Sequence, residues 1–417
     1  MAGSTPRIAV LGAGIGGLTA AVALLRRGFH VDVYEQAGQL REAGVGLHLG
    51  SNGSRILHRL GLAGELRKSA VRPAALEVRA FDDGRVFTRQ PMGPAWEAEH
   101  GAPYYTVQRA DLLRMLAALV PERRLHLGRR CTGFAEDADG VRLSFERGPD
   151  TEADVLVGAD GVHSVVRRAV AGPERPLPSG TVAYRGVVPF DELAHLARDT
   201  MFVWPGPASR LLAYPVDSGR LLTFVAILPE DGGDARESWS APGDTRTVSE
   251  ALDGWEPAVR EIVAAIRTVG RWVLRDRAPL DRWSTARVTL LGDAAHPMLP
   301  HHGQGANQAI EDAAALALCL SQAPLGPHRY DLALRRYELV RRPHTTRVQL
   351  GSRGSGSLRL RGPDPAPGSA PAPGSAPGPG SAAGSRSGGP VGGALGSLVE
   401  DVAWIQSYDV EAVLASS

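Results

Sequence analysis

A glycine-rich turn near the N-terminus has the residue types and spacing of a phosphate-binding site. It reads Gly12-Ala-Gly14-Ile-Gly-Gly17. Gly12 permits a tight turn, Gly14 lets a pyrophosphate approach the backbone, and Gly17 lets a helix pack closely against a strand. The free N–H groups at the start of the next helix favour a phosphate, and Glu35 is placed to accept hydrogen bonds from an adenosine ribose. This unit predicts a dinucleotide site without distinguishing FAD from NAD.

Two further motifs place a carboxylate directly after an apolar strand. One is Val-Leu-Val-Gly-Ala-Asp160-Gly161, and the other is Thr-Leu-Leu-Gly-Asp293. At the carboxyl end of its strand, Asp293 is well placed to bind a polyol hydroxyl. Gly303 and Gly305 then precede another helix. The N-terminus of that helix favours negative charge on whatever it faces.

The elements that must position these motifs alternate between strand and helix. Apolar strands are expected at 7–11 and 30–34, with a helix at 18–27 between them. From 181 to 228, β-branched and aromatic strands separated by Gly and Pro turns favour a mixed or antiparallel sheet. We therefore predict an α/β fold with a Rossmann-like cofactor-binding domain, an inserted mixed β-sheet substrate domain and a C-terminal helical tail.

The cofactor domain is expected to be discontinuous in sequence. Its strand-then-helix alternation returns after the β-rich region, and a Gly, Pro, Ala and Ser stretch near the C-terminus lacks the apolar side chains needed for ordering. The predicted division is a cofactor domain at 1–75, 101–175 and 276–345, a substrate domain at 76–100 and 176–275, a helix end at 346–361, a flexible linker at 362–394 and a tail helix at 395–417.

Composition restricts the class of partner. The chain has 46 basic and 45 acidic residues, a balance that argues against nucleic acid or a polybasic membrane anchor. No apolar run reaches the length of a membrane span, and the two cysteines, Cys131 and Cys319, fit a reducing compartment. We expect a soluble cytoplasmic protein, either a monomer or a homodimer.

Together the three motifs resemble, over roughly residues 6 to 345, the single-component FAD-dependent aromatic hydroxylases of the para-hydroxybenzoate hydroxylase type. The sequence is most similar to the salicylate hydroxylase and 3-hydroxybenzoate 6-hydroxylase branch, and its tail Trp404-Ile-Gln-Ser-Tyr408-Asp409 resembles that branch's carboxyl end. The resemblance implies a monooxygenase with FAD as cofactor and NADH or NADPH as transient reductant. It would use O2 to hydroxylate a small phenolic or aminohydroxybenzoate-type acid through a flavin C4a-hydroperoxide.

The resemblance also implies roles for the cofactor-binding residues. Arg41 and Arg109 match arginines that embrace the cofactor's ribose and pyrophosphate, and Cys131 lies where a backbone contact to adenine is expected. Asp160 would serve structure and the brief NAD(P)H encounter together, and Asp293 would bind the ribityl chain. The ADP half of FAD would be held by Gly12, Gly14, Gly17 and Glu35, and the flavin pyrimidine would face Gly305 and Ala306.

Three residues are candidates for contacting substrate and handling its proton: His48, Tyr214 and His302. The branch often carries histidine at the place of Ala213, so its absence puts a simple salicylate-type substrate in doubt. Histidines 296, 301 and 302 invite a metal interpretation, but no carboxylate or thiolate accompanies them at ligand spacing. We therefore predict no metal.

Some alternatives remain open on sequence alone. The substrate could be a larger polyketide-type aromatic, which would make the protein a tailoring oxygenase. The chain could also be a non-catalytic flavin-binding redox sensor or assembly subunit, with its tail recruiting a partner. Glu311 and Asp312, on the helix after the third motif, are expected to be solvated or capping residues rather than catalysts.

Overall fold

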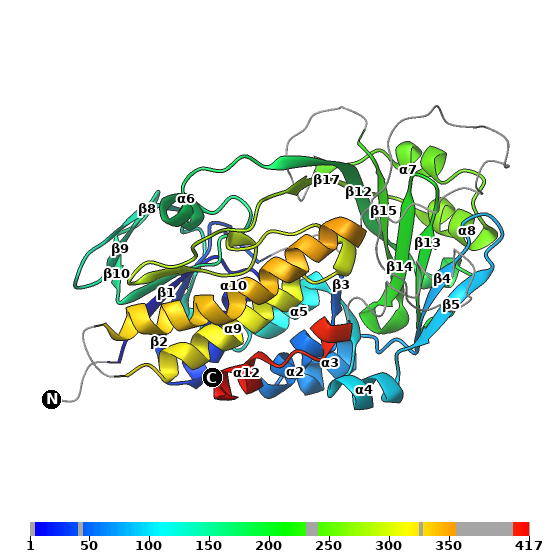
Figure 1. The fold of residues 1–417 in the computed structure, drawn as a ribbon. Coiled ribbons are helices and arrows are strands. Elements are labelled where there is room, and N and C mark those ends of the chain that lie inside the picture. Colours follow the sequence, from blue (N-terminus) through cyan, green and yellow to red (C-terminus); the bar gives the residue numbers. More distant parts are fainter. Residues whose placement is uncertain (1–4, 41–44, 231–240, 325–327, 356–402, 417) are drawn as a thin grey trace, which may run out of the picture.

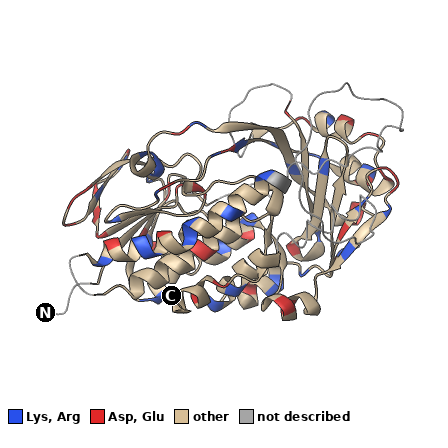
Figure 2. Cartoon of the chain, in the orientation of Figure 1, with Lys and Arg blue, Asp and Glu red and all other residues tan. Residues whose placement is uncertain are grey.

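The computed structural model describes residues 5–40, 45–230, 241–324, 328–355 and 403–416. Two large sheets organise this part of the chain, one behind helices α9 and α10 and the other at the right-hand end of the view (Figure 1). Acidic and basic residues are interspersed along the helices and strands (Figure 2). The predicted linker at 362–394 and Arg41 lie outside the described residues.

The first large sheet is parallel and carries the glycine-rich turn. Its central strands are buried on both faces, which explains their nearly unbroken apolar runs. Helices α1 (Ile15–Arg26) and α9 (Gly305–Ser321) pack together beside it. In spatial order the strands are β18 (Val288–Leu290), β11 (Val155–Gly158), β1 (Arg7–Leu11), β2 (His30–Tyr34) and β7 (Leu125–His126).

The second large sheet is mixed. Its described strands pair antiparallel except for β13 with β4. One face packs against helices α7 (Thr245–Ala251) and α8 (Pro257–Ala265) in a separate core. In spatial order the strands are β16 (Ala241–Pro242), β17 (Gly270–Asp276), β12 (Leu177–Pro189), β15 (Leu221–Pro229), β14 (Arg210–Val216), β13 (Thr200–Pro205), β4 (Ala75–Arg79) and β5 (Val86–Pro91).

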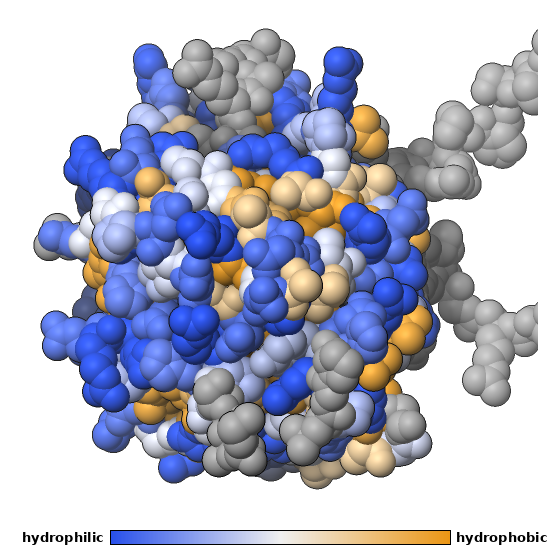
Figure 3. Space-filling model, turned by 90° about the vertical axis from the view of Figure 1, so that its left-hand side faces the viewer, coloured by the Kyte–Doolittle hydropathy of each residue, from blue (hydrophilic) through white to orange (hydrophobic). Residues whose placement is uncertain are grey.

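On the face at the left of Figure 1, the surface is mostly hydrophilic, with hydrophobic residues gathered near its middle (Figure 3).

Smaller elements complete the described structure. The small sheets are β10 (Thr151–Ala153), β9 (Val141–Phe145) and β8 (Cys131–Glu136), and β3 (Gly46–Leu49) with β6 (Tyr105–Gln108). The other helices are α2 (Ser51–Arg59), α3 (Ala63–Ser69), α4 (Pro94–His100), α5 (Arg109–Ala117), α6 (Val165–Ala171), α10 (Arg329–Ser355) and α12 (Val410–Ser416).

The α/β class, the inserted mixed sheet and the helical tail are confirmed. The tail is broken rather than one helix: residues 403–406 are helical, Tyr408 and Asp409 are not, and α12 follows. Residues 395–402 lie outside the described part, and the domain boundaries stay a prediction. Within the ranges the structure describes, none of the helices has the length and apolarity that a membrane crossing requires.

Candidate active site

A cavity of about 430 Å³ lies where the parallel sheet meets the mixed sheet. All three sequence motifs contribute to its wall, although they are far apart along the chain. Five of the predicted cofactor residues line it, namely Gly14, Arg109, Asp293, Gly305 and Ala306. The three candidates for contacting substrate also line it, namely His48, Tyr214 and His302. The fold therefore brings both predicted groups to one site.

The first turn fits the pyrophosphate of a dinucleotide. Gly12 has φ of +100°, and a Cβ there would lie 2.3 Å from the carbonyl oxygen of Ala159. A Cβ on Gly17 would lie 2.0 Å from the Gly12 carbonyl oxygen. At Gly14, by contrast, the space that a Cβ would enter holds no heavy atom within 4 Å. The turn thus packs tightly on the protein side and is open on the cavity side, directly before α1.

Glu35 and Cys131 lie outside the cavity wall. The Glu35 carboxylate accepts hydrogen bonds from the backbone N–H groups of Ala13 and Ala37, both at 2.8 Å. It is therefore held at the end of β2 beside the first turn. Cys131 begins β8, half-buried, with its Sγ 3.3 Å from the Gly133 carbonyl oxygen. Burial raises the pKa of its thiol.

Asp160 caps a helix. Its carboxylate accepts hydrogen bonds from the Ser164 hydroxyl at 2.5 Å and the Val165 N–H at 2.7 Å, at the start of α6. Burial raises its pKa, and those hydrogen bonds oppose the rise. Its neighbours Ala159 and Gly161 line the cavity. By binding the start of α6, Asp160 therefore fixes the backbone of the second motif without lining the cavity itself.

Asp293 and the start of α9 bring charge to the cavity. The backbone oxygen of Asp293 accepts a hydrogen bond from the Arg167 guanidinium at 3.0 Å, which fixes the turn after β18. Burial raises the pKa of the Asp293 carboxyl. Gly305 and Ala306 open the 17-residue helix α9, so its positive end faces the same space. The arrangement fits a polyol chain beside a ring system that gains negative charge.

His48 lies among aromatic side chains beside the loop that precedes α9, where a Cβ on Gly303 would be 3.1 Å from its Nδ1. It belongs to β3, its Nδ1 is 3.0 Å from the Tyr104 hydroxyl, and its ring meets that of Tyr214 edge-on with centroids 4.1 Å apart. Burial lowers the pKa of His48 to about 4, so the imidazole is neutral at pH 7. Burial also raises the pKa values of Tyr104 and Tyr214, and both therefore keep their protons.

Strand β14 decides which residues of the mixed sheet face the cavity. Side chains alternate along a strand, and Arg210, Leu212 and Tyr214 line the cavity while Leu211 and Ala213 belong to the core under α7 and α8. The Ala213 side chain therefore points away from the cavity, and the doubt about a salicylate-type substrate stays a prediction.

Arg210 is one of several polar cavity residues that the sequence analysis missed; Gln90, Arg185, Arg275, Arg277 and Gln406 also line the cavity. The Arg210 guanidinium donates a hydrogen bond to Nδ1 of His301 at 2.6 Å. Burial lowers the pKa of Arg210 to about 10, so it keeps its charge at pH 7, and burial and Arg210 together lower the pKa of His301 to about 3. The period-2 alternation from Tyr214 back along the strand was the signal that could have found it.

The three histidines that invited a metal interpretation point to different places. His296 is buried, and its Nε2 lies 2.6 Å from the Asp312 carboxylate. His301 pairs with Arg210, and His302 lies against α10, where a Cβ on Gly351 would be 3.1 Å from the His302 ring. Within the described ranges, no group of three or more His, Cys, Asp or Glu side chains is arranged to hold a metal ion.

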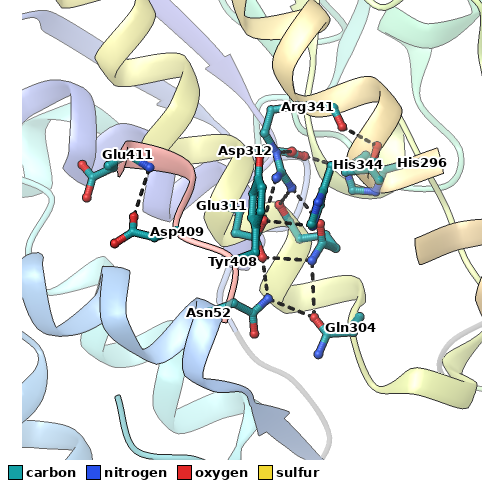
Figure 4. A network of polar contacts seen from close by, with 12 residues as sticks. Asn52, His296, Gln304, Glu311, Asp312, Arg341, His344, Tyr408, Asp409 and Glu411 are labelled. Atoms are coloured by element: carbon teal, nitrogen blue, oxygen red, sulfur yellow. Dashed lines mark hydrogen bonds and ion pairs between the residues drawn. The ribbon is translucent and has the colours of Figure 1, made fainter. Parts of the chain in front are cut away.

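Glu311 and Asp312 contradict the expectation that they are solvated or capping residues. Both are fully buried, and both pair with the fully buried Arg341 of α10, at 2.6 and 2.7 Å (Figure 4). Burial alone would raise the pKa of Asp312, but the charges of His296 and Arg341 lower it to about 2. The reason is packing: α10 covers this face of α9 and supplies the counter-charge. The network lies immediately behind the cavity wall.

Comparisons with known proteins agree with this geometry. Residues 5–351 match the FAD binding domain family. The chain is 44% identical over 352 residues to the 3-amino-4-hydroxybenzoate 2-monooxygenase of Streptomyces platensis, covering 84% of this chain and 88% of that protein.

Two solved structures share the fold over most of their length. A salicylate hydroxylase in complex with substrate superposes with a TM-score of 0.78 at 27% identity, covering 98% of this chain and 97% of the other. HpxO of Klebsiella pneumoniae, solved with FAD and uric acid, gives a TM-score of 0.77 at 30% identity, covering 85% and 89%. The chain therefore belongs to the FAD binding domain family of flavoprotein monooxygenases, and FAD is its cofactor.

Proposed function

We propose that this flavoprotein monooxygenase hydroxylates a small aromatic acid of the hydroxybenzoate or aminohydroxybenzoate type, with O2 and with NADH or NADPH as reductant. The observation that carries the proposal is a half-buried cation, Arg210, in the same cavity as the cofactor turn and the His48–Tyr214 pair. The side chains around Arg210 on β13 and β14 include the apolar Val203 and Leu212. Such a wall suits an aromatic ring that carries one carboxylate.

FAD, when bound, supplies the redox chemistry, accepting hydride from NAD(P)H and activating O2. The chain's own residues bind it and control its surroundings. In this proposal Gly12, Gly14, Gly17 and Glu35 form the ADP site, with Arg41, Arg109 and Cys131 beside it. Asp293 binds the ribityl chain. The N-terminus of α9, at Gly305 and Ala306, stabilises negative charge on the pyrimidine ring, and Asp160 holds the second motif in place.

His48 handles the proton of the substrate's ring hydroxyl. Because the imidazole is neutral, one ring nitrogen carries a proton and the other accepts one. We assign the proton to Nδ1, which then donates to the Tyr104 oxygen, so that the Nε2 lone pair is free to take the hydroxyl proton. Deprotonation enriches the ring in electrons and favours oxygen transfer. Tyr214 holds the His48 ring edge-on, and His302 closes the cavity from the α10 side.

We favour a small acid over a larger polyketide-type substrate, because the Arg210 guanidinium on β14, beside the apolar Val203 and Leu212, suits one carboxylate on a single ring. The monooxygenase relatives favour an enzyme over a redox sensor. We further propose that the protein acts in the cytoplasm as a monomer or homodimer, without nucleic acid or membrane partners. Both cysteines are free thiols, which fits a reducing compartment.

The test is a screen of NAD(P)H oxidation with peroxide measured in parallel. Substrates would include 3-amino-4-hydroxybenzoate, 4-hydroxybenzoate and salicylate, each paired with its carboxamide. We expect one or more acids to stimulate oxidation and the matched carboxamide to lose most of that stimulation. The Arg210→Met variant should raise KM for the acid about 10- to 100-fold, as expected for losing a charge-assisted hydrogen bond. Equal activity on acid and carboxamide would refute the assignment of Arg210.

A further inference from the structure

The backbone that follows His48 is held by two side chains. Asn307 of α9 donates a hydrogen bond from its side chain to the His48 carbonyl oxygen at 3.1 Å and accepts one from the Gly50 N–H at 3.0 Å. One residue further on, Oε1 of Gln406 accepts a hydrogen bond from the Ser51 N–H at 2.9 Å. Gln406 belongs to the C-terminal segment, 355 positions away, and it also lines the active-site cavity.

Gln406 acts as a cap that helix α2 cannot supply itself. The first N–H groups of a helix have no partner within it, and the residue preceding α2 is Gly50, which has no side chain to accept from them. A Cβ on Gly50 would lie 2.5 Å from Oε1 of Gln406, so the glutamine amide occupies the space beside this turn. Gln406 is only 3% exposed.

The C-terminal segment is anchored along one face of α2. Ser51, Arg55 and Arg59 are spaced four residues apart and therefore share a face. Arg55 donates to the Tyr408 carbonyl oxygen at 2.9 Å, and Arg59 pairs with Asp409 at 2.7 Å. The segment thus runs parallel to α2, from Gln406 at the start of the helix to Asp409 near its end.

Aromatic and apolar contacts fix the same segment from its other side. The ring of Tyr408 stacks on that of His344 with centroids 3.7 Å apart, next to the buried network of α9 and α10 (Figure 4). Ile405 and Val410 are fully buried. The position of Gln406 is therefore set by contacts on both sides rather than by a single hydrogen bond.

We propose that Gln406 is a positioning residue for hydroxylation: the C-terminal segment delivers it to the active site, where it caps α2 and holds the His48 wall closed against water. The proposal rests on the proposed function, because it concerns the same cavity. A loosened His48 wall admits water, and an open site releases reduced oxygen as peroxide rather than transferring it to substrate.

The test replaces Gln406 by methionine, which keeps the length of the side chain but removes the acceptor. Gln322→Met is the matched control, since Gln322 is exposed and contacts Arg336 far from the cavity wall. In the FAD-loaded protein, hydrogen–deuterium exchange of peptides covering residues 46–55 should quicken at least fivefold in Gln406→Met and stay unchanged in Gln322→Met. This readout does not depend on the identity of the substrate.

Catalysis supplies the second readout. Gln406→Met should retain FAD, lower kcat/KM for the best acid about tenfold and raise the peroxide formed per NAD(P)H several-fold. The pH below which kcat falls, the acid limb of the pH–rate profile, should also rise from about 4. Water entering the cavity weakens the burial that lowers the pKa of His48. A merely structural role would lower the melting temperature while leaving the peroxide ratio and the acid limb unchanged.

The outcomes separate the two proposals. Faster exchange together with raised peroxide supports positioning by Gln406. Faster exchange with the peroxide yield per NAD(P)H unchanged from wild type overturns the proposal. So does unchanged exchange. If wild-type enzyme shows no stimulation by any aromatic acid, the proposed function fails, and the exchange experiment alone still decides whether Gln406 caps α2.

Discussion

Replacing Arg341 by methionine should destabilise the FAD-loaded protein by about 3–5 kcal/mol, the typical cost of removing one partner from a buried ion pair. Arg341, Glu311 and Asp312 are all fully buried, and the guanidinium lies 2.6 and 2.7 Å from the two carboxylates. Methionine fills similar space, so the loss reflects two carboxylates left without their shared cation rather than a large cavity.

The loss should depend on pH. In the native protein, burial by itself raises the pKa of Asp312, but His296 and Arg341 lower it from 3.8 to about 2. A depressed pKa contributes stability above the unfolded value, and this contribution is lost as pH falls through the native value. Without Arg341 the pKa of Asp312 is lowered less, so the ionised Asp312 carboxylate contributes less to the free energy of unfolding. The difference between wild type and variant should therefore be largest near neutral pH and narrow as pH falls from about 4 towards 2.

The assay is urea unfolding followed by circular dichroism at several pH values. Arg335→Met is the matched control on the same helix, because Arg335 pairs with Asp331 at 2.7 Å but is 70% exposed. Exposed pairs contribute about 0–1 kcal/mol, so the control should change little. A loss for Arg341→Met no larger than for Arg335→Met, or a difference that grows on acidification, would refute this reasoning.

Two further predictions concern the cofactor turn and the proton. Gly12→Ala should yield colourless protein that does not bind added FAD, because φ is +100° and the Cβ would lie 2.3 Å from the Ala159 carbonyl oxygen. The control variant Gly64→Ala, whose Cβ meets no atom within 4 Å, should stay yellow. A yellow Gly12→Ala protein would contradict the role of the turn. His48→Gln should lower kcat about 10²- to 10⁴-fold. It should also remove the fall of kcat expected below about pH 4, where His48 becomes protonated. If the variant's pH–rate profile still shows that fall, the fall belongs to another group.

Local sequence was sufficient to predict the turns and helix starts that line the cavity. The glycine spacing, the strands before Asp160 and Asp293, and the helix at Gly305 depend on backbone conformation and short-range periodicity, which neighbouring residues encode. Relatives and solved structures confirmed the family, the fold class and FAD. The individual site assignments stay predictions, and Arg41 lies outside the described residues.

Packing decided the remaining features. Arg210 was missed although it lies within the predicted strand region, because only the tertiary structure shows that this end of β14 lines the cavity and meets His301, 91 positions away. The sequence analysis attached a doubt about the substrate to Ala213, and only the alternation along β14 shows that this side chain lies in the core.

By itself, the sequence determined where the chain turns, which strands are buried and that the first turn suits a dinucleotide, since those properties follow from steric limits on a few adjacent residues. Only the tertiary structure decided that Glu311 and Asp312 are buried ion partners and that Gln406 reaches the cavity. Whether a polar side chain meets water or a counter-charge depends on which distant element covers it. That choice is made by the packing of α10 and the C-terminal segment against α9 and α2.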